Sequence, residues 1–362
     1  MMGGSPVPCL PPPLPDIRAK PGQLWQRRWW SSGVPDASVG GGIVATAPVR
    51  TQVGERVLQL SNLDKVLFPD GTTKAELVQY YLAIAPVLLP HLADRCITRL
   101  RFPNGTAEQS FYEKNAPRGT PQWVRTAAVQ AQEAVIDYVV AEEPATLVWL
   151  ANLAAIELHT PQWRTIDAPG PEPGSPHNPI ALEGGQPVPA TTVVVDLDPG
   201  PGITMHQLCL AAMLAAHELA SQGLVPYVKT TGSKGLQLMA SIEPTPWRTV
   251  VEQTRRLGAQ LAAQHQDLFT TTMAKEARPG RIYWDHLQNR GDRNTISVYS
   301  VRGRHEPRVS TPLTWEEIAA VGPDDDLSFT ITDLPGRLEE HGDLWEPLLG
   351  PEEAAPLPTW PE

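Results

Sequence analysis

The feature that most constrains the fold is a β-branched run that ends in two carboxylates. Residues 192–198 read Thr-Val-Val-Val-Asp-Leu-Asp, and a Pro-Gly-Pro-Gly segment follows at 199–202. The valines favour a buried strand, and the Pro/Gly turn ends it. Asp196 and Asp198 then share one face of the strand, with Cα atoms about 6–7 Å apart. Because burying two carboxylates is costly unless something compensates their charge, this strand end is a candidate metal site.

The segments around this strand alternate between strand and helix patterns. After it, the sequence predicts helices over 204–222 and 246–265, and strands over 225–231, 236–242, 281–285 and 295–301. Before it, the sequence predicts a strand over 57–60, a helix over 75–81 closed by Pro86 and Pro90, a buried helix over 145–156 that leads to an exit at Pro161, and an irregular connection over 168–189. This order is typical of an α+β fold with a mixed or antiparallel sheet flanked by helices.

Composition divides the chain into three parts. With 362 residues, 41% of them hydrophobic, it can bury a sizeable core, and its 39 prolines are concentrated near the N-terminus and around 168–189. We expect a flexible Pro/Gly-rich extension over 1–50, a folded domain over 51–350 and a tail over 351–362. The Arg-Trp cluster at 25–30 could stack on bases or bind a partner, but a local contact with the folded domain is the simpler interpretation.

The charge and cysteine content restrict the partners. A formal net charge of −11 argues against non-specific coating of nucleic acid or of an anionic membrane, so a nucleic-acid site must be a local basic patch. Basic residues do outnumber acidic ones between Lys275 and Arg308. The three cysteines show no disulfide or zinc spacing, and no segment has the length of a membrane span. We expect a cytoplasmic monomer with no membrane partner.

Two further stretches have the composition of a phosphate site. Residues 230–235, Thr-Thr-Gly-Ser-Lys-Gly, combine three hydroxyls, accessible backbone and one cation, although the spacing is not that of a P-loop. Residues 302–304, Arg-Gly-Arg, place two guanidinium groups at the end of a predicted strand. A plain β-turn and solvated arginines are the structural alternatives, and an Asp-x-Asp at a strand end does not by itself require a metal.

Five motifs, taken together and in order, resemble a known family. They lie at 60–69, 157–163, 195–200, 230–235 and 300–304. In this order they resemble the polymerase domain of bacterial ligase D, a member of the archaeo-eukaryotic primase superfamily, over roughly residues 55–345. The resemblance implies a primase-polymerase catalytic domain that performs template-dependent nucleotidyl transfer with two Mn²⁺ or Mg²⁺ ions and favours ribonucleotides.

The resemblance also implies site residues. Asp196, Asp198 and Asp285 match the catalytic, metal-binding triad, and the assignment of Asp285 depends on this match alone. The positions that match nucleotide-binding residues are His159, Thr231, Ser233, Lys234, Arg278, Gln288 and Arg302. The positions that match DNA-binding residues are Asn62, Lys65 and Lys74, in a pocket for a downstream 5′-phosphate, and Phe111 and Tyr112, an aromatic pair near the template break. Thr231 and Tyr112 depart from the family's usual serine and phenylalanine.

Partners follow from the same resemblance. We expect the protein to use nucleoside triphosphates and to act, at the bacterial nucleoid, on DNA gaps or double-strand breaks that carry a 5′-phosphate. The sequence has no Lys-x-Asp-Gly motif of a fused ATP-dependent ligase, so it resembles a stand-alone enzyme that depends on a separate DNA ligase and could use an end-bridging protein.

Three other functions stay open at this point. One is a primase that starts primers de novo. Another is an Asp-x-Asp phosphohydrolase, with Asp196 as nucleophile, Asp198 as acid/base and an acidic loop at 324–326 for Mg²⁺. The last is a non-catalytic module that binds 5′-phosphorylated ends through its basic pocket and aromatic side chains.

Overall fold

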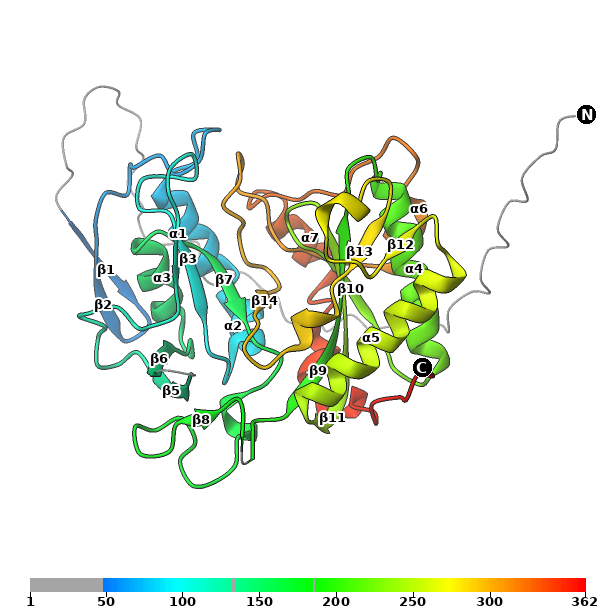
Figure 1. Ribbon diagram of the computed structural model, residues 1–362. Helices are drawn as coiled ribbons and strands as arrows, with labels where there is room; N and C mark the ends of the chain where they lie inside the picture. Colours follow the sequence, from blue (N-terminus) through cyan, green and yellow to red (C-terminus); the bar gives the residue numbers. More distant parts are fainter. Residues whose placement is uncertain (1–47, 132–133, 185) are drawn as a thin grey trace, which may run out of the picture.

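The computed structural model of the protein describes residues 48–131, 134–184 and 186–362. Two groups of sheets and helices stand side by side in it (Figure 1). The Arg-Trp cluster and nearly all of the predicted N-terminal extension lie outside the described residues. Within them, no helix is both long enough and apolar enough to cross a membrane.

The first group contains three small sheets and three helices. The strands are β1 (Val49–Val53) with β2 (Arg56–Leu60); β14 (Thr295–Ile296), β7 (Ala155–Thr160), β3 (Thr98–Arg101) and β4 (Phe111–Glu113), in that spatial order; and β6 (Val135–Val139), β5 (Thr126–Gln130) and β8 (Ile180–Ala181). The helices are α1 (Lys74–Ala83), α2 (Ala85–Leu92) and α3 (Pro144–Asn152). Thr73 and Glu76 form a capping box that starts α1.

The second group is built on one six-stranded sheet. Its spatial order is β12 (Phe269–Thr270), β13 (Ile282–Trp284), β9 (Ala190–Pro199), β11 (Leu236–Thr245), β10 (Tyr227–Thr230) and β15 (Pro312–Leu313). All neighbours pair antiparallel except β12 with β13. The helices are α4 (Met205–Ser221), α5 (Trp247–Gln264), α6 (Trp315–Ala320) and α7 (Leu334–His341). The predicted α+β class, with mixed or antiparallel sheets flanked by helices, is confirmed.

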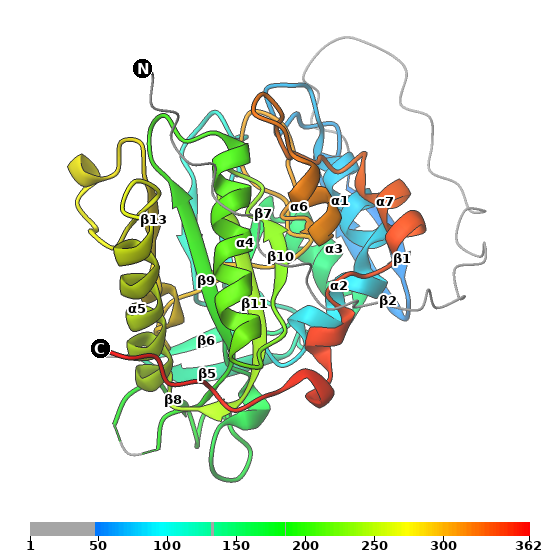
Figure 2. The same ribbon diagram turned by 90° about the vertical axis from the view of Figure 1, so that its right-hand side faces the viewer.

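The central strand β9 separates the core from the candidate site. Val193, Val195 and Leu197 face one way and join the apolar core formed with α4 and α5. Figures 1 and 2 both show these two helices along one face of the sheet. Because side chains alternate along a strand, Asp196 and Asp198 face the opposite way.

Several predicted elements differ from the structure. The helix predicted over 145–156 ends at Asn152, because Ala154 adopts a left-handed φ of 57°, and the chain continues as β7. The motif at 157–160 is therefore on a strand and not at a helix end. The strand predicted over 295–301 stops at Ile296, since Tyr299 turns the chain with a φ of 62°.

The prediction that Pro86 and Pro90 end the helical region after α1 was wrong. Pro86 stands in the first turn of α2, where a missing N–H costs no hydrogen bond, and Pro90 lies within the same short helix. The chain therefore continues as a second helix where the sequence predicted an end.

The two ends of the described chain also contribute to the structure. β1 begins at Val49, two residues before the predicted start of the folded domain at residue 51. Residues 351–362, expected as a tail, pack on the six-stranded sheet, where Ala355 pairs with Ile242 and Trp360 is buried in the core under α5.

Candidate active site

The acidic triad assembles at one end of β9. Asp196 and Asp198 lie on this strand. Asp285 directly follows β13, and the antiparallel pairing of β13 with β9 brings it beside them. The backbone N–H of Asp285 donates to the carbonyl of Asp196 at 3.1 Å. One carboxylate oxygen from each of the three aspartates lies within 4.8 Å of the other two. The structure therefore brings together the three residues that the resemblance grouped.

Burial and repulsion from neighbouring carboxylates disfavour ionisation of Asp196 and Asp198. Burial, followed by the charges of Asp198 and Asp285, raises the pKa of Asp196 to about 7, although Gln237 and Lys229 act in the opposite direction. Burial and the charge of Asp285 also raise the pKa of Asp198, against the effect of Arg278. Three converging carboxylates with too little positive charge around them form a donor set that suits a hard divalent cation such as Mg²⁺ or Mn²⁺.

A buried polar chain supports Asp196 from the neighbouring strands. The amide of Gln237, on β11, donates to Asp196 Oδ1 at 2.8 Å. Lys229, on β10, donates to Gln237 Oε1 at 2.7 Å and to Ser310 Oγ at 2.8 Å. Lys229 is 0% exposed, and this burial lowers its pKa to about 7, while the charge of Asp196 opposes the change.

A second carboxylate, Glu157, organises two predicted nucleotide-binding residues. His159 Nε2 lies 2.9 Å from Glu157 Oε2, and Arg302 Nε lies 3.4 Å from Glu157 Oε1. The backbone N–H of Gly303 donates to the same Oε1 at 2.9 Å. Burial lowers the pKa of His159, and the partnership with Glu157 only partly offsets this effect. Glu157 thus fixes the geometry of a site in which its own charge would repel phosphate.

The turn at 230–235 lies against Arg302. The hydroxyl of Thr231 accepts the N–H groups of Ser233 and Gly235, so it shapes the turn itself. Gly232 has a φ of 66°, and a Cβ there would lie 2.6 Å from Arg302 Cγ, so this position needs glycine. Ser233 Oγ accepts from Arg304 at 2.8 Å. Lys234 is exposed and makes no hydrogen bond or ion pair within the described chain.

The other two predicted nucleotide-binding residues lie next to the triad. The guanidinium of Arg278 stacks on the ring of Tyr283, 3.9 Å from its centroid. The amide of Gln288 lies 3.4 Å from Asp285 Oδ2. Three buried atoms in this region, Arg278 Nε, Gln288 Oε1 and Arg302 Nε, have no hydrogen-bond partner among the described residues. Buried polar atoms are seldom left unpaired unless an ion, water or ligand completes them.

The predicted 5′-phosphate pocket lies in the first group of elements. Lys65 donates to the carbonyl of Pro103, and Lys74 donates to the carbonyl of Asn152 at 3.0 Å. Lys74 is only 5% exposed, which excludes an ordinary surface lysine, and burial together with the charge of Lys65 lowers its pKa. Asn62, exposed and with a φ of 51°, accepts the N–H of Lys65 through its own carbonyl. The side-chain amino groups of Lys65 and Lys74 are close enough for the charge of Lys65 to affect Lys74.

Loop contacts connect this pocket to the turn at 230–235. Lys65 also donates to Asn104, at 3.3 Å, and two residues later the Thr106 hydroxyl donates to the carbonyl of Arg304 at 2.7 Å. The side chain of Arg304 in turn donates to Ser233. A continuous series of contacts thus runs from the lysine pair to the predicted triphosphate site.

The predicted aromatic pair is solvent-exposed. Phe111 and Tyr112, on the edge strand β4, are 45% and 59% exposed. No hydrogen bond joins them to the triad within the described residues. Large exposed aromatic rings on a sheet edge are available for stacking, as a base-binding role requires.

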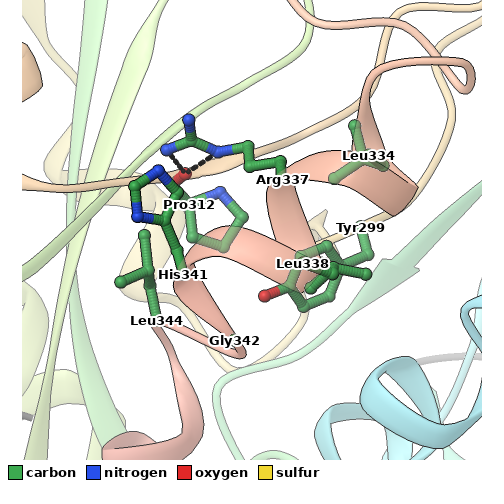
Figure 3. A pocket seen from close by; sticks show the side chains of 8 residues that line it. All are labelled: Tyr299, Pro312, Leu334, Arg337, Leu338, His341, Gly342 and Leu344. Atoms are coloured by element: carbon green, nitrogen blue, oxygen red, sulfur yellow. Dashed lines mark hydrogen bonds between the residues drawn. The ribbon is translucent and has the colours of Figure 1, made fainter. Parts of the chain in front are cut away.

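Two cavities lie apart from these residues. One of about 320 Å³ opens beside Thr192, at the other end of β9, and none of the predicted site residues lines it. The second, shown in Figure 3, has about 10 Å³ beneath α7, where Arg337 donates to the carbonyl of Pro312. It is too small for a nucleotide.

Sequence reasoning missed three residues of the site: Glu157, Lys229 and Gln237. Glu157 stands inside a quoted motif but received no role. Lys229 and Gln237 alternate with apolar residues in predicted strands, so inward-facing polar side chains were a signal that could have been used.

Comparison with known proteins agrees with this geometry. A family described as the LigD primase-polymerase domain matches residues 73–345. The multifunctional non-homologous end joining protein LigD of Mycolicibacterium smegmatis is 40% identical over 297 residues, which cover 81% of this chain and 36% of that protein. The bifunctional non-homologous end joining protein LigD of Bacillus subtilis is 31% identical over 296 residues, covering 79% of this chain and 43% of that protein.

A solved structure is also similar. The polymerase domain from Mycobacterium tuberculosis ligase D, in complex with DNA, superposes with a TM-score of 0.73 at 38% identity, covering 81% of this chain and 98% of that one. This chain thus spans less than half the length of each of the two curated relatives named above. It belongs to the LigD primase-polymerase domain family, with the fold and the nucleotidyltransferase class that its motifs predict.

Proposed function

We propose that the chain is a template-dependent polymerase that fills short DNA gaps or extends broken ends next to a downstream 5′-phosphate. The observation that carries this proposal is the acidic triad together with Arg278 and Arg302, whose charges act on its carboxyl groups and whose buried Nε atoms make no hydrogen bond within the described chain. Anion-binding donors beside a carboxylate cluster are what a metal-bound nucleoside triphosphate requires. The separate lysine pair supports a second phosphate site.

Each group has a role in the proposed reaction. Asp196, Asp198 and Asp285 would hold two divalent ions, which when bound supply charge neutralisation at the transferring phosphate and lower the pKa of the attacking hydroxyl. Lys234 and Arg302 bind the oxygens of the triphosphate as cations, with Arg302 held in position by Glu157. Arg278 and Gln288 orient the nucleotide next to the triad.

The DNA side of the proposal depends on two other features. Lys65 and Lys74, with Asn62 beside them, bind a terminal 5′-phosphate, which carries more charge than an internal one. Phe111 and Tyr112 stack on bases near the template break. We also propose a role in end joining, because the relatives are named as end-joining proteins.

Ion identity and sugar preference complete the proposal. Mn²⁺ in preference to Mg²⁺, and ribonucleotides in preference to deoxyribonucleotides, follow from the family resemblance. Family membership supports a nucleotidyltransferase over a phosphohydrolase. Within the described chain, Asp325 and Asp326 of the acidic loop cap the N–H groups of Gly322 and Leu327 and lie outside the carboxylate cluster.

One assay tests these points together. The protein is incubated with labelled ribo- or deoxyribonucleoside triphosphates and Mn²⁺ or Mg²⁺. The substrates are a gapped duplex with a downstream 5′-phosphate, the same duplex with a 5′-hydroxyl, an open primer-template and an unprimed template. We expect the greatest extension with Mn²⁺, ribonucleotides and the 5′-phosphate, and a preference for phosphate that shrinks as salt rises. Products on the unprimed template would favour the primase.

Matched variants distinguish the effect of the phosphate pocket from that of a general loss of positive charge. Lys65→Ala/Lys74→Ala should abolish the preference for 5′-phosphate but retain extension of the open primer-template. The control Arg248→Ala/Arg255→Ala removes the same charge from α5, on the other face of the six-stranded sheet, and should keep the preference. Because Lys74 is buried, melting temperatures of both double variants are compared first. Equal wild-type binding to phosphate and hydroxyl duplexes at low salt would refute the gap-filling proposal.

A further inference from the structure

The buried chain from Lys229 through Gln237 to Asp196 has a direction that chemistry fixes. When Lys229 is protonated, its ammonium carries only donors, so the atom of Gln237 that faces it is the carbonyl oxygen. The other end of the same amide, which faces Asp196 at 2.8 Å, is then necessarily the NH₂ group. The assignment of the amide oxygen and nitrogen follows from the chemistry of its neighbours.

We propose that Lys229 is a positioning residue for the metal site, which acts by locking the amide of Gln237 so that it holds one oxygen of Asp196. This inference rests on the proposed function, since it assigns a role to residues behind the proposed metal ligands. Asp196 Oδ1 accepts the Gln237 amide, whereas Oδ2 accepts no hydrogen bond from the described residues. The chain therefore fixes the carboxylate and leaves its second oxygen available.

Folding alone gives a poor explanation for a lysine at this position. Lys229 is 0% exposed, and a buried ion pair or ion network often contributes no more stability than well-packed apolar residues of similar volume. Its ammonium is held by Gln237, by Ser310 and by the face of Trp345, 5.7 Å from the ring centroid. Such a fixed cation, two hydrogen bonds away from a metal ligand, is expected of an outer-shell orienting group.

Direct binding of Mn²⁺ tests this role without relying on turnover. Free Mn²⁺ is measured by electron paramagnetic resonance in titrations of the full chain, with and without a nucleoside triphosphate. Lys229→Met and Gln237→Met remove the polar groups at nearly constant volume. Loss of an outer-shell partner weakens metal affinity by about 10- to 100-fold, and we expect an effect of this size for each variant.

A double variant distinguishes one path from two independent effects. If Lys229 acts only through Gln237, the double variant should bind Mn²⁺ no more weakly than the weaker single variant. The control Ser241→Ala alters a buried polar residue on the same strand and face as Gln237, outside the chain, and should bind like wild type. KM for the nucleotide at saturating Mn²⁺ should change little in all of them, because phosphate contacts come from other residues.

The possible results separate the alternatives. Lys229→Met that binds Mn²⁺ as tightly as wild type, or more tightly, would overturn the proposal, because a mere positive charge near the site repels the ion. Fully additive losses in the double variant would also overturn it. If Lys229→Met does not fold, Gln237→Met alone tests the proposal. Unchanged Mn²⁺ affinity in Gln237→Met would then refute the role of the hydrogen bonds from Lys229 through Gln237 to Asp196. If wild type behaves like Asp196→Asn and binds no Mn²⁺, the proposed function itself fails.

Discussion

Replacing Asp196 by asparagine is expected to stabilise the metal-free protein at neutral and alkaline pH. In the folded protein the pKa of Asp196 is about 7, compared with 3.8 for the ordinary side chain. A carboxyl group whose pKa is raised on folding binds its proton more tightly in the folded state. Stability therefore falls as pH rises from about 4 to about 7 and stays low above that range.

The magnitude follows from this difference in pKa. Each pH unit corresponds to about 1.4 kcal/mol, so ionised Asp196 destabilises the empty site by about 4 kcal/mol at pH 8, as an upper limit. Asparagine has nearly the shape of the protonated acid and carries no charge. Between pH 5 and pH 8, the free energy of unfolding of Asp196→Asn should rise relative to wild type by about 3 kcal/mol.

Urea unfolding in EDTA at a series of pH values measures this difference. Asp267→Asn, at an exposed aspartate without a hydrogen bond or ion pair in the described chain, serves as the control and should follow wild type. Added Mn²⁺ should stabilise wild type at pH 8 and leave Asp196→Asn unchanged. Parallel stability curves for wild type and Asp196→Asn from pH 5 to pH 8 would refute the argument that burial opposes ionisation.

Two further variants test the nucleotide site, and a third tests the packing of the backbone beside it. Glu157→Gln weakens the charged hydrogen bond that orients His159, so KM for the nucleotide should rise about tenfold in steady-state extension assays; an unchanged KM would contradict this role. Lys234→Ala should raise the same KM several-fold without changing the melting temperature, because the side chain has no partner in the described chain, and a lower melting temperature would count against this. Gly303→Ala should destabilise the fold by about 1–3 kcal/mol in urea unfolding, since its Cβ would lie 2.2 Å from the ring of Phe102; a wild-type midpoint would argue otherwise.

The sequence predicted the part of the site that depends only on residues close together in the chain. The alternation in residues 192–198 was sufficient to place Asp196 and Asp198 on one strand face, because strand geometry depends only on neighbours in sequence. Asp285 could be named only by resemblance, since its position depends on the pairing of β13 with β9, more than eighty residues apart in sequence.

The errors in the fold have a related cause. The apolar run around residues 145–156 fits either a buried helix or a buried strand, and only the left-handed turn at Ala154 divides it into α3 and β7. Lys229 and Gln237 were missed because each one alone is an unremarkable strand residue. Their significance appears when β9, β11 and β10 lie next to each other in one sheet.

The hairpin formed by β10 and β11 carries two lysines with very different access to solvent. Lys229 is wholly enclosed, whereas Lys234, at the tip, is exposed. An amine-reactive acylating reagent will therefore modify Lys234 rapidly in the native protein and reach Lys229 only when the sheet opens. Under native conditions, the rate at which Lys229 becomes acylated thus measures how often the centre of this polymerase domain comes apart.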